Sequence, residues 1–219
     1  MASFFNLTLD TLAPSGLSLS INGGAQYSTT FSVTLSIGIS DDSSTGYQMK
    51  IWGIKGVETE DAASWETYSK SKTVELTSGD GLKTVYVKVR DDVYNETSAV
   101  SSSITVNTSV PSVTISGPDV GRISKVSPKN VAIFSFISDV AFVEYKVKVV
   151  PNGSSLQDAG TQISTTGGSV NMSGTGEFEA SSAIQCKIYG SDLESASSGD
   201  GAKIVKVFVK NAAGTWSVA

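Results

Sequence analysis

Apolar and polar residues alternate along most of the chain, in short runs that are separated by turns rich in Gly, Ser and Asp. The clearest run is written twice, at residues 78–90 and 198–210, with a constant offset of 120 positions. Each copy starts with Ser-Gly-Asp-Gly and continues with valine at every second position: Val85, Val87, Val89 and Val205, Val207, Val209. A period of two places these valines on one face of a strand, against a core. A repeat of this length indicates two domains of one architecture in tandem.

Further alternating runs predict about seven or eight short strands in the first half of the chain, at the spacing of a β-sandwich. The second half repeats the layout, and its longest run, at 142–150, places Tyr145, Val147 and Val149 on one face. No window of about twelve residues has helical apolar spacing without Gly, Pro or β-branched clusters. The sequence therefore predicts an all-β protein with two sandwich domains, 11–109 and 110–219, that meet near Thr108-Ser109-Val110-Pro111.

The N-terminal end of the chain has one strand more than the domain pattern requires, and the C-terminal end has one strand fewer. Residues 5–9 alternate like a strand, and residues 7–14 (Leu-Thr-Leu-Asp-Thr-Leu-Ala-Pro) resemble residues 104–111 (Ile-Thr-Val-Asn-Thr-Ser-Val-Pro). That second stretch is the last strand and linker of domain 1. The offset of 120 places the counterpart of this last strand at about 221–226, beyond Ala219. We therefore expect domain 2 to lack its last strand, while residues 1–10 supply a spare one.

An unpaired sheet edge is a liability unless something covers it. One hypothesis is that residues 4–10 of one copy, or a strand of another protein, complete domain 2 of a neighbour by strand addition. The residues that would enter the sheet are Phe4, Phe5, Leu7 and Leu9. Two alternatives stay open. Residues 4–10 pack on their own domain and domain 2 closes with fewer strands, or the sequence belongs to a longer array.

Charge and cysteine content narrow the classes of partner. The net charge is −5, and no cluster of Lys and Arg forms a basic footprint, so we expect no nucleic-acid partner. The start of the chain has neither a basic n-region nor a sustained apolar stretch, so we expect no export signal and no membrane span. The single cysteine, Cys186, shares a strand face with Ile184 and Ile188, which is typical of a small core residue.

Candidate chemistry is sparse. The chain has no histidine, the commonest general base, and no Gly-X-Ser-X-Gly elbow, so we expect no enzyme and assign no catalytic residue. Loop carboxylates and an amide offer oxygen ligands for a structural calcium ion, with turn capping as the alternative: Asp10, Asp41, Asp42, Asp91, Asp92 and Asn95. No calcium-loop spacing is present, so we assign no metal site and no cofactor.

Two aromatic residues are candidates for contact with a ligand. Trp65 and Tyr68 lie beside the acidic loop at 57–61, and exposed flat rings of this kind can stack on sugars. The alternative is that they pack in or near the core. Exposure of both rings along a groove would favour a binding role, whereas burial of both would count against it.

Several stretches together carry a resemblance: Leu9-Asp-Thr-Leu-Ala-Pro-Ser-Gly16, Ile21-Asn-Gly-Gly-Ala25, Gln48-Met-Lys-Ile51, Trp65-Glu-Thr-Tyr68, the Ser-Gly-Asp-Gly turn and Val85 to Asn95. They resemble the bacterial-type immunoglobulin-like modules of bacteriophage virion proteins and prokaryotic surface proteins. The resemblance covers most of 9–107 and the second half more weakly. It implies two tandem immunoglobulin-like β-sandwich domains.

The resemblance also implies a function. It suggests a non-enzymatic structural protein of a virion, at a tail, baseplate, neck or fibre, that folds in host cytoplasm. Its partners would be other virion proteins or copies of itself. The alternative is a carbohydrate- or receptor-binding adhesion module that attaches the particle to a glycan on the host surface.

Overall fold

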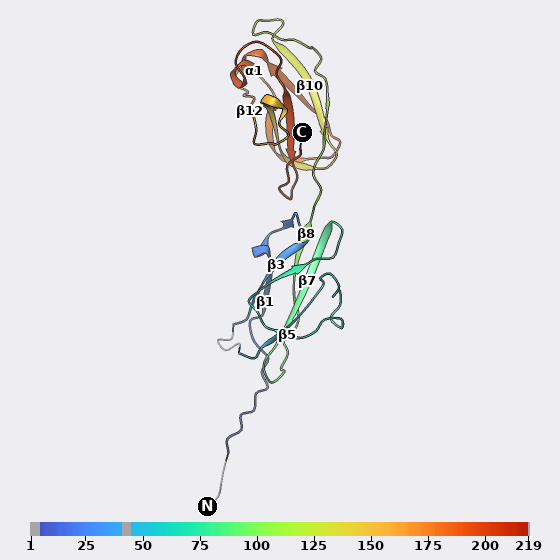
Figure 1. Ribbon diagram of the computed structural model, residues 1–219, viewed down its shortest axis with the longest axis vertical. Helices are drawn as coiled ribbons and strands as arrows, with labels where there is room; N and C mark the ends of the chain where they lie inside the picture. Colours follow the sequence, from blue (N-terminus) through green and yellow to red (C-terminus); the bar gives the residue numbers. More distant parts are fainter. Residues whose placement is uncertain (1–4, 41–44, 219) are drawn as a thin grey trace, which may run out of the picture. The chain divides into compact units, whose positions relative to one another are not determined.

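The computed structural model describes residues 5–40 and 45–218, and these form two compact units, Met1–Thr108 and Ser109–Ala219. Figure 1 shows that each unit is built from strands. Three residues named above, Phe4, Asp41 and Asp42, lie outside the described residues. The prediction of an all-β, immunoglobulin-like sandwich fold is confirmed by the sheets of both units.

Unit 1 is a sandwich of two sheets. One sheet has the order β1-β3-β6, with β1 at Ser18–Ile21, β3 at Ser32–Gly38 and β6 at Ser71–Glu75. The other has the order β2-β8-β7-β4-β5, with β2 at Tyr27–Ser28, β4 at Gln48–Trp52, β5 at Glu66–Thr67, β7 at Gly81–Arg90 and β8 at Val100–Val106. A 3₁₀ turn at Asn22–Gly24 follows β1.

The core of unit 1 lies between these sheets. The predicted valines of β7, Val85, Val87 and Val89, are fully buried, as are alternate residues of β3. From the last strand, β8, Ile104 and Val106 enter the same core and are 1% exposed. The period-two pattern therefore marks the buried face of each strand, as expected for a sheet with one face on a core.

Unit 2 is also a sandwich of two sheets. The order β14-β10-β9 joins β9 at Val113–Ser116, β10 at Val131–Ser138 and β14 at Ile184–Tyr189. In the second sheet, β11 at Phe142–Val149 pairs with β12 at Thr161–Gln162, β13 at Ser173–Phe178 and β15 at Val205–Lys210. A 3₁₀ turn at Pro151–Gly153 and a seven-residue helix, α1 at Gly190–Ala196, complete the unit.

Aromatic rings fill one part of the core of unit 2. Phe142 stacks on Phe178 with ring centroids 4.8 Å apart, and Tyr145 lies edge-on to both rings. Phe136, from the facing sheet, packs against Phe142 and Tyr145. Such tilted and offset pairs are the preferred contacts of aromatic rings, so this cluster holds the two sheets together.

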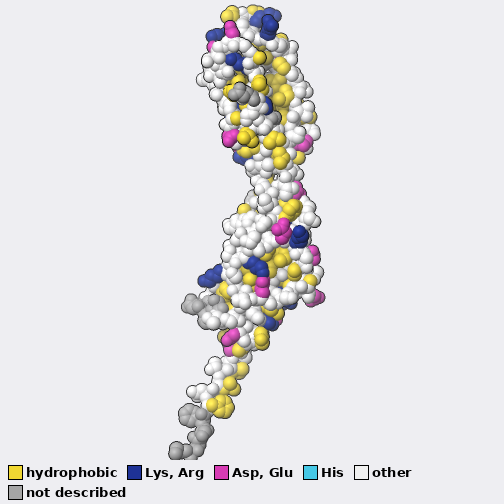
Figure 2. Space-filling view, in the orientation of Figure 1, with side chains coloured by type: hydrophobic (Ala, Val, Ile, Leu, Met, Phe, Trp, Pro, Cys, Tyr) yellow, Lys and Arg dark blue, Asp and Glu magenta, His cyan; other side chains and the backbone are white. Residues whose placement is uncertain are grey.

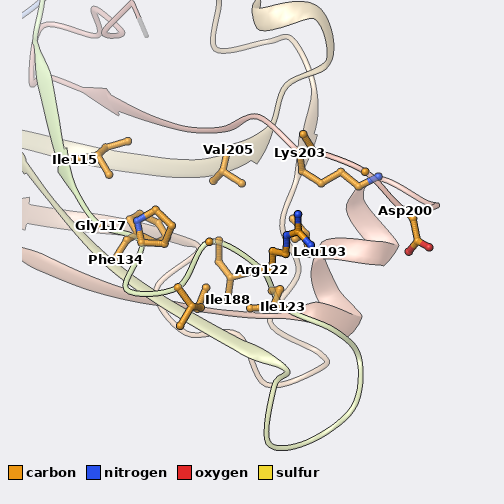
Figure 3. A pocket seen from close by; sticks show the side chains of 16 residues that line it. Ile115, Gly117, Arg122, Ile123, Phe134, Ile188, Leu193, Asp200, Lys203 and Val205 are labelled. Atoms are coloured by element: carbon orange, nitrogen blue, oxygen red, sulfur yellow. The ribbon is translucent and has the colours of Figure 1, made fainter.

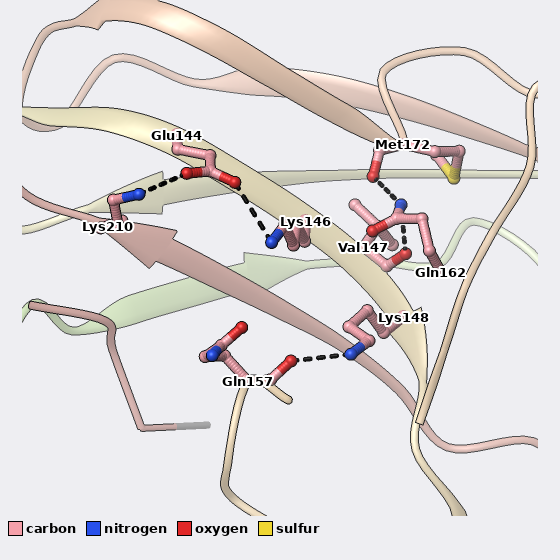
Figure 4. A network of polar contacts seen from close by, with 8 residues as sticks. All are labelled: Glu144, Lys146, Val147, Lys148, Gln157, Gln162, Met172 and Lys210. Atoms are coloured by element: carbon pink, nitrogen blue, oxygen red, sulfur yellow. Dashed lines mark hydrogen bonds and ion pairs between the residues drawn. The ribbon is translucent and has the colours of Figure 1, made fainter. Parts of the chain in front are cut away.

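Polar side chains tie β11 to its neighbours on the outer face of its sheet (Figure 4). Glu144 accepts charge-assisted hydrogen bonds from Lys210, at 2.6 Å, and from Lys146, at 3.2 Å. Lys148 donates to the carbonyl of Gln157 at 2.7 Å, and Gln162 donates to the carbonyls of Val147 and Met172. These contacts link β11 with β15 and with the segment that carries β12.

The turns that follow the two repeated strands have the same hydrogen bonds. After β7, the amide of Asp91 donates to Asn95 O, and the Thr97 hydroxyl accepts from Val89 N. After β15, the amide of Asn211 donates to Thr215 O, and the Ser217 hydroxyl accepts from Val209 N. The offset is again 120, so the repeat that the sequence shows over 198–210 continues in the structure to residue 217.

The N-terminal segment differs from its sequence-based expectation. Residues 5–9 alternate like a strand, but within the described residues they pair with no other segment. Phe5, Leu7 and Leu9 are 85%, 86% and 85% exposed, and Figure 2 shows apolar side chains of this segment open to view. In this structure the segment is therefore not packed on its own domain.

Candidate functional site

The most distinctive feature of unit 2 is the open edge of β15. In unit 1, β7 lies between two strands: it pairs with β4 on one side and with β8 on the other. Its counterpart β15 pairs with β11 on one side. On its other side the residues that follow the strand cover only its far end, through a bridge between Lys210 and Trp216, and no named strand of the described residues pairs with the rest. An antiparallel strand directs half of its backbone N–H and C=O groups to each side, so this edge offers a row of groups for another strand.

A groove of about 840 Å³ runs beside this edge. Its walls are mainly apolar and come from both sheets, from α1 and from the loop after β9: Ile115, Ile123, Phe134, Ile188, Leu193 and Val205. Figure 3 shows Ile115 and Val205 on one side of the opening and Ile123 and Ile188 on the other. Ile115 is 42% exposed and Val120, at the rim, is 40% exposed, so the apolar walls are open to solvent.

Unit 1 has a strand where unit 2 has the groove. There, β8 pairs with β7 on one side and with β2, in parallel, on the other, and it packs over β1 of the facing sheet. The matching parts of unit 2 are β15, by the sequence repeat, and β9, by its place at the edge of the facing sheet, and both contribute residues to the groove. The groove therefore has the position and the flanking elements of the strand that β8 supplies in unit 1.

Polar groups at the mouth of the groove also have counterparts in unit 1. The carboxylate of Asp80 holds the second residue after β8: it accepts from Thr108 N at 3.0 Å and from Thr108 Oγ1 at 2.8 Å. Its counterpart, Asp200, lines the groove and has no hydrogen-bond partner among the described residues. Nearby, Lys203 donates to Ser198 O at 3.1 Å, just as Lys83 donates to Ser78 O at 3.1 Å. The turn before β15 thus has the same form as the turn before β7.

The two candidate ligand-contact aromatics lie in unit 1, away from the groove of unit 2. Tyr68 packs against the core, and its hydroxyl donates to Ile37 O at 2.9 Å. Burial raises the pKa of this phenol. Trp65 is half-buried, with the guanidinium of Arg90 4.3 Å from its ring centroid. Tyr68 therefore has a structural role, and a cation covers part of the Trp65 ring.

Two of the carboxylates that were candidates for calcium, those of Asp91 and Asp10, hold turns. Asp91 is buried, and its carboxylate accepts from Val93 N, Asn95 N and Asn95 Nδ2. Burial alone would raise the pKa of Asp91, but these hydrogen bonds outweigh it and lower that pKa. Asp10 Oδ1 accepts from Leu12 N at 3.0 Å. In the part of the chain that the structure describes, no three His, Cys, Asp or Glu side chains gather to hold a metal ion.

Cys186 lies in the core of unit 2, where its thiol donates to Asn171 O at 3.2 Å. Burial raises the pKa of this thiol to about 12, so the reactive thiolate is not formed at neutral pH. No helix among residues 5–40 and 45–218 has the length and apolar character that crossing a membrane requires.

Sequence reasoning predicted a spare strand at residues 5–9, which remains a prediction, and it missed most of the groove. Val205 was expected on a core face, whereas Ile115, Ile123, Ile188 and Leu193 gave no sign that they would line an opening. The signal that pointed to the site was the comparison of the two ends of the chain.

No family model matches the sequence, and no curated protein matches it. Solved structures with similar folds include the fibronectin(III)-like modules of Clostridium thermocellum CbhA, at 9% identity and a TM-score of 0.45, covering 92% of this chain and 90% of that one. A chitinase ChiA74 from Bacillus thuringiensis is 12% identical, with a TM-score of 0.31, over 92% of this chain and 30% of its own. These likenesses are distant. The immunoglobulin-like sandwich fold of each unit rests on its own sheet topology.

Proposed function

We propose that this chain is a non-enzymatic structural protein of a bacteriophage virion, placed in a tail, baseplate, neck or fibre, and that it assembles through sheet edges and apolar surface. One observation carries the proposal. The edge of β15 is open beside an apolar groove, at the position that unit 1 closes with a strand of its own. An edge of this kind is a template for pairing with another chain.

The assignment to a virion is supported by the resemblance of residues 9–107 to immunoglobulin-like modules of phage virion proteins. Such a protein would fold and assemble in the host cytoplasm. Its partners would be other virion proteins or copies of itself. The exposed apolar side chains of Phe5, Leu7 and Leu9 support assembly, because moving large apolar groups out of water lowers the free energy.

The buried polar groups also support a structural role. Asp91 and Asp192 are buried, and both carboxylates accept hydrogen bonds from the backbone of nearby loops. They therefore fix loop conformation, and their oxygen atoms do not point into the groove.

The proposal is tested on particles made from the genome that encodes the chain. Purified particles are separated on a density gradient and analysed by quantitative mass spectrometry. We expect the chain in the particle fraction, at a constant ratio to the other particle proteins across independent preparations. A gradient in which complete particles lack the chain, while it remains among the free proteins of the lysate, would overturn the proposal.

A further inference from the structure

We propose that residues 5–11 of one copy enter the groove of unit 2 in a second copy, as a strand antiparallel to residues 201–205, the segment that leads into β15. The partner of the open edge is then another molecule of the same chain. The assembly role of this contact rests on the function proposed above, but the contact itself is a property of the chain in solution.

The sequence of residues 7–11 matches the end of β8 position by position. Leu-Thr-Leu-Asp-Thr stands against Ile-Thr-Val-Asn-Thr at 104–108, so every position keeps its class of side chain. In unit 1 the apolar positions of this stretch, Ile104 and Val106, are 1% exposed. The matching residues, Leu7 and Leu9, are almost fully exposed in their own chain. They have the side chains of a core strand and no core to enter.

The pairing of β7 with β8 fixes the register of the proposed strand. In unit 1, Gly81 faces Val106, Lys83 faces Ile104 and Val85 faces Ser102. Transferred through the two repeats, Leu9 faces Gly201, Leu7 faces Lys203 and Phe5 faces Val205. Residues directly opposite in a sheet share a face. Phe5, Leu7 and Leu9 therefore all point into the groove, between β15 and β9.

A polar contact closes the end of the strand in the same register. Asp80 accepts two hydrogen bonds from Thr108, the residue that ends the β8 stretch. The counterpart of Thr108 is Thr11, and the counterpart of Asp80 is Asp200, whose carboxylate is exposed at the mouth of the groove. The proposed strand thus gives Asp200 the partner that Asp80 has in unit 1.

Geometry inside unit 1 favours a second copy over the same chain. Asn95 Nδ2 donates to Asp10 O, which holds residue 10 at the end of β7 where the 91–95 turn lies. Thr108, which leads to unit 2, is held by Asp80 at the opposite end of β7. The ten residues of β7 span about 33 Å, whereas five extended residues, 5–9, reach about 17 Å. The segment is therefore too short to return along its own unit to where unit 2 begins.

The register is tested by cross-linking full-length chains. In unit 1 the hydroxyls of Thr84 and Ser103, which face each other, are 2.9 Å apart. Their counterparts are Ile204 and Asn6. We expect Asn6→Cys chains, mixed with Ile204→Cys chains under mild oxidation, to form a disulfide between copies. Cys186 should not form competing disulfides, because its thiol is buried. Asn6→Cys mixed with Val170→Cys, an exposed position far from the edge in sequence, is the control that should not react.

Assembly in solution gives the second readout. Light scattering on the unmodified chain should show a mass that rises with concentration, and Leu7→Asp with Leu9→Asp should reduce it to a monomer. Leu12→Asp is the matched control, because Leu12 is 79% exposed but lies beyond the proposed strand. A third variant, with residues 3–11 appended after Ala219 and residues 1–9 deleted, carries the strand in its own chain. It should be a folded monomer.

Three results would overturn the proposal: a monomer at all concentrations, a disulfide yield with Val170→Cys as high as with Ile204→Cys, or assembly that survives the Leu7 and Leu9 substitutions. These results are separate from those on particles. A chain that is monomeric alone but present in virions would refute strand exchange and leave the virion role standing. A chain that exchanges strands but is missing from particles would do the reverse.

Discussion

Single carboxylates hold several loops of this protein in place. Asp192, in the first turn of α1, is 3% exposed and accepts from Gly167 N at 2.7 Å and from Ser169 N at 2.9 Å. Burial alone would raise its pKa, but the hydrogen bonds from Ser169 and Gly167 outweigh it, so the pKa of Asp192 is lowered. The ionised form is therefore the one that the fold of unit 2 requires.

Replacing this carboxylate should destabilise unit 2. Asp192→Asn keeps the size of the side chain but puts an NH₂ group against one of two backbone donors. We expect a loss of about 1–3 kcal/mol in the free energy of unfolding, the cost of an unsatisfied buried group. Urea unfolding followed by fluorescence measures it. Glu177→Gln, at an exposed carboxylate of unit 2, is the control, and equal losses for both variants would contradict this account.

Acid should weaken the fold through the same groups. Hydrogen bonds from Lys210 lower the pKa of Glu144. Despite burial, hydrogen bonds from the 93–95 turn lower the pKa of Asp91, and hydrogen bonds from Ser169 and Gly167 lower the pKa of Asp192. A folded pKa below the unfolded value gives stability that is complete above the unfolded pKa and is lost as pH falls through the folded pKa. We expect the urea midpoint to be level near neutral pH and to fall below about pH 4.

The Asp192→Asn variant provides the internal check on this pH dependence. Because it lacks one of the carboxylates that must be protonated, its stability should fall less steeply with acid than that of the parent chain. An equally steep fall would show that other groups dominate the acid response.

At the scale of elements, the alternation of apolar and polar residues predicted the strands that occur in both repeats and that have a clear local pattern. β7 and β15 were predictable because Val85, Val87 and Val89 and their counterparts mark a buried face at a period of two. The helix α1 was not predicted, since seven residues are too short for a 3.6-residue period to stand out. Residues 5–9 have the pattern of a strand, but a strand needs a partner for its hydrogen bonds.

The candidate site was predictable only in part, for a related reason. The spare strand and the missing one follow from comparing residues 7–14 with 104–111. The groove walls do not, because Ile123 and Leu193 lie in a loop and a short helix whose approach to β15 is decided by tertiary packing. Trp65 illustrates the same limit: the cation over its ring, Arg90, comes from a strand 25 positions away in sequence.

The equivalence of the two repeated strands can be tested at their closing hydrogen bonds. Thr97→Val removes the hydroxyl that accepts from Val89 N, and Ser217→Ala removes the one that accepts from Val209 N. Both sites are buried, so we expect each change to cost about 1–3 kcal/mol in unfolding free energy. Ser217→Thr keeps the acceptor and should cost less than Ser217→Ala. A cost at only one of the two sites would mean that the turns are not equivalent.

At the scale of the whole molecule, the two units have separate cores. A strand that fills the groove should therefore stabilise unit 2 and leave unit 1 unchanged. A chain without residues 1–9 retains the groove, and a peptide of residues 3–12 can then be added in excess. At a hundredfold excess over its Kd, a ligand that binds only the folded state adds about 2.7 kcal/mol.

Calorimetry with this peptide separates the two units. We expect the melting transition of unit 2 to move to higher temperature, and substitutions at unit 2 such as Asp192→Asn identify which transition that is. The same peptide with Asp in place of Leu7 and Leu9 should move neither transition. A shift of the unit 1 transition would show that the peptide binds unit 1, which would contradict the proposed site in unit 2.

Each chain has one apolar N-terminal segment and one open β15 edge. If copies exchange strands as proposed, an assembly of any size contains equal numbers of segments and edges. A linear row of copies then ends with one unpaired segment and one unpaired edge. The mean length of such rows would respond to small amounts of a terminator. Chains without residues 1–9 would stop growth at one end and the isolated peptide at the other, so the ratio of intact to truncated protein would set the length.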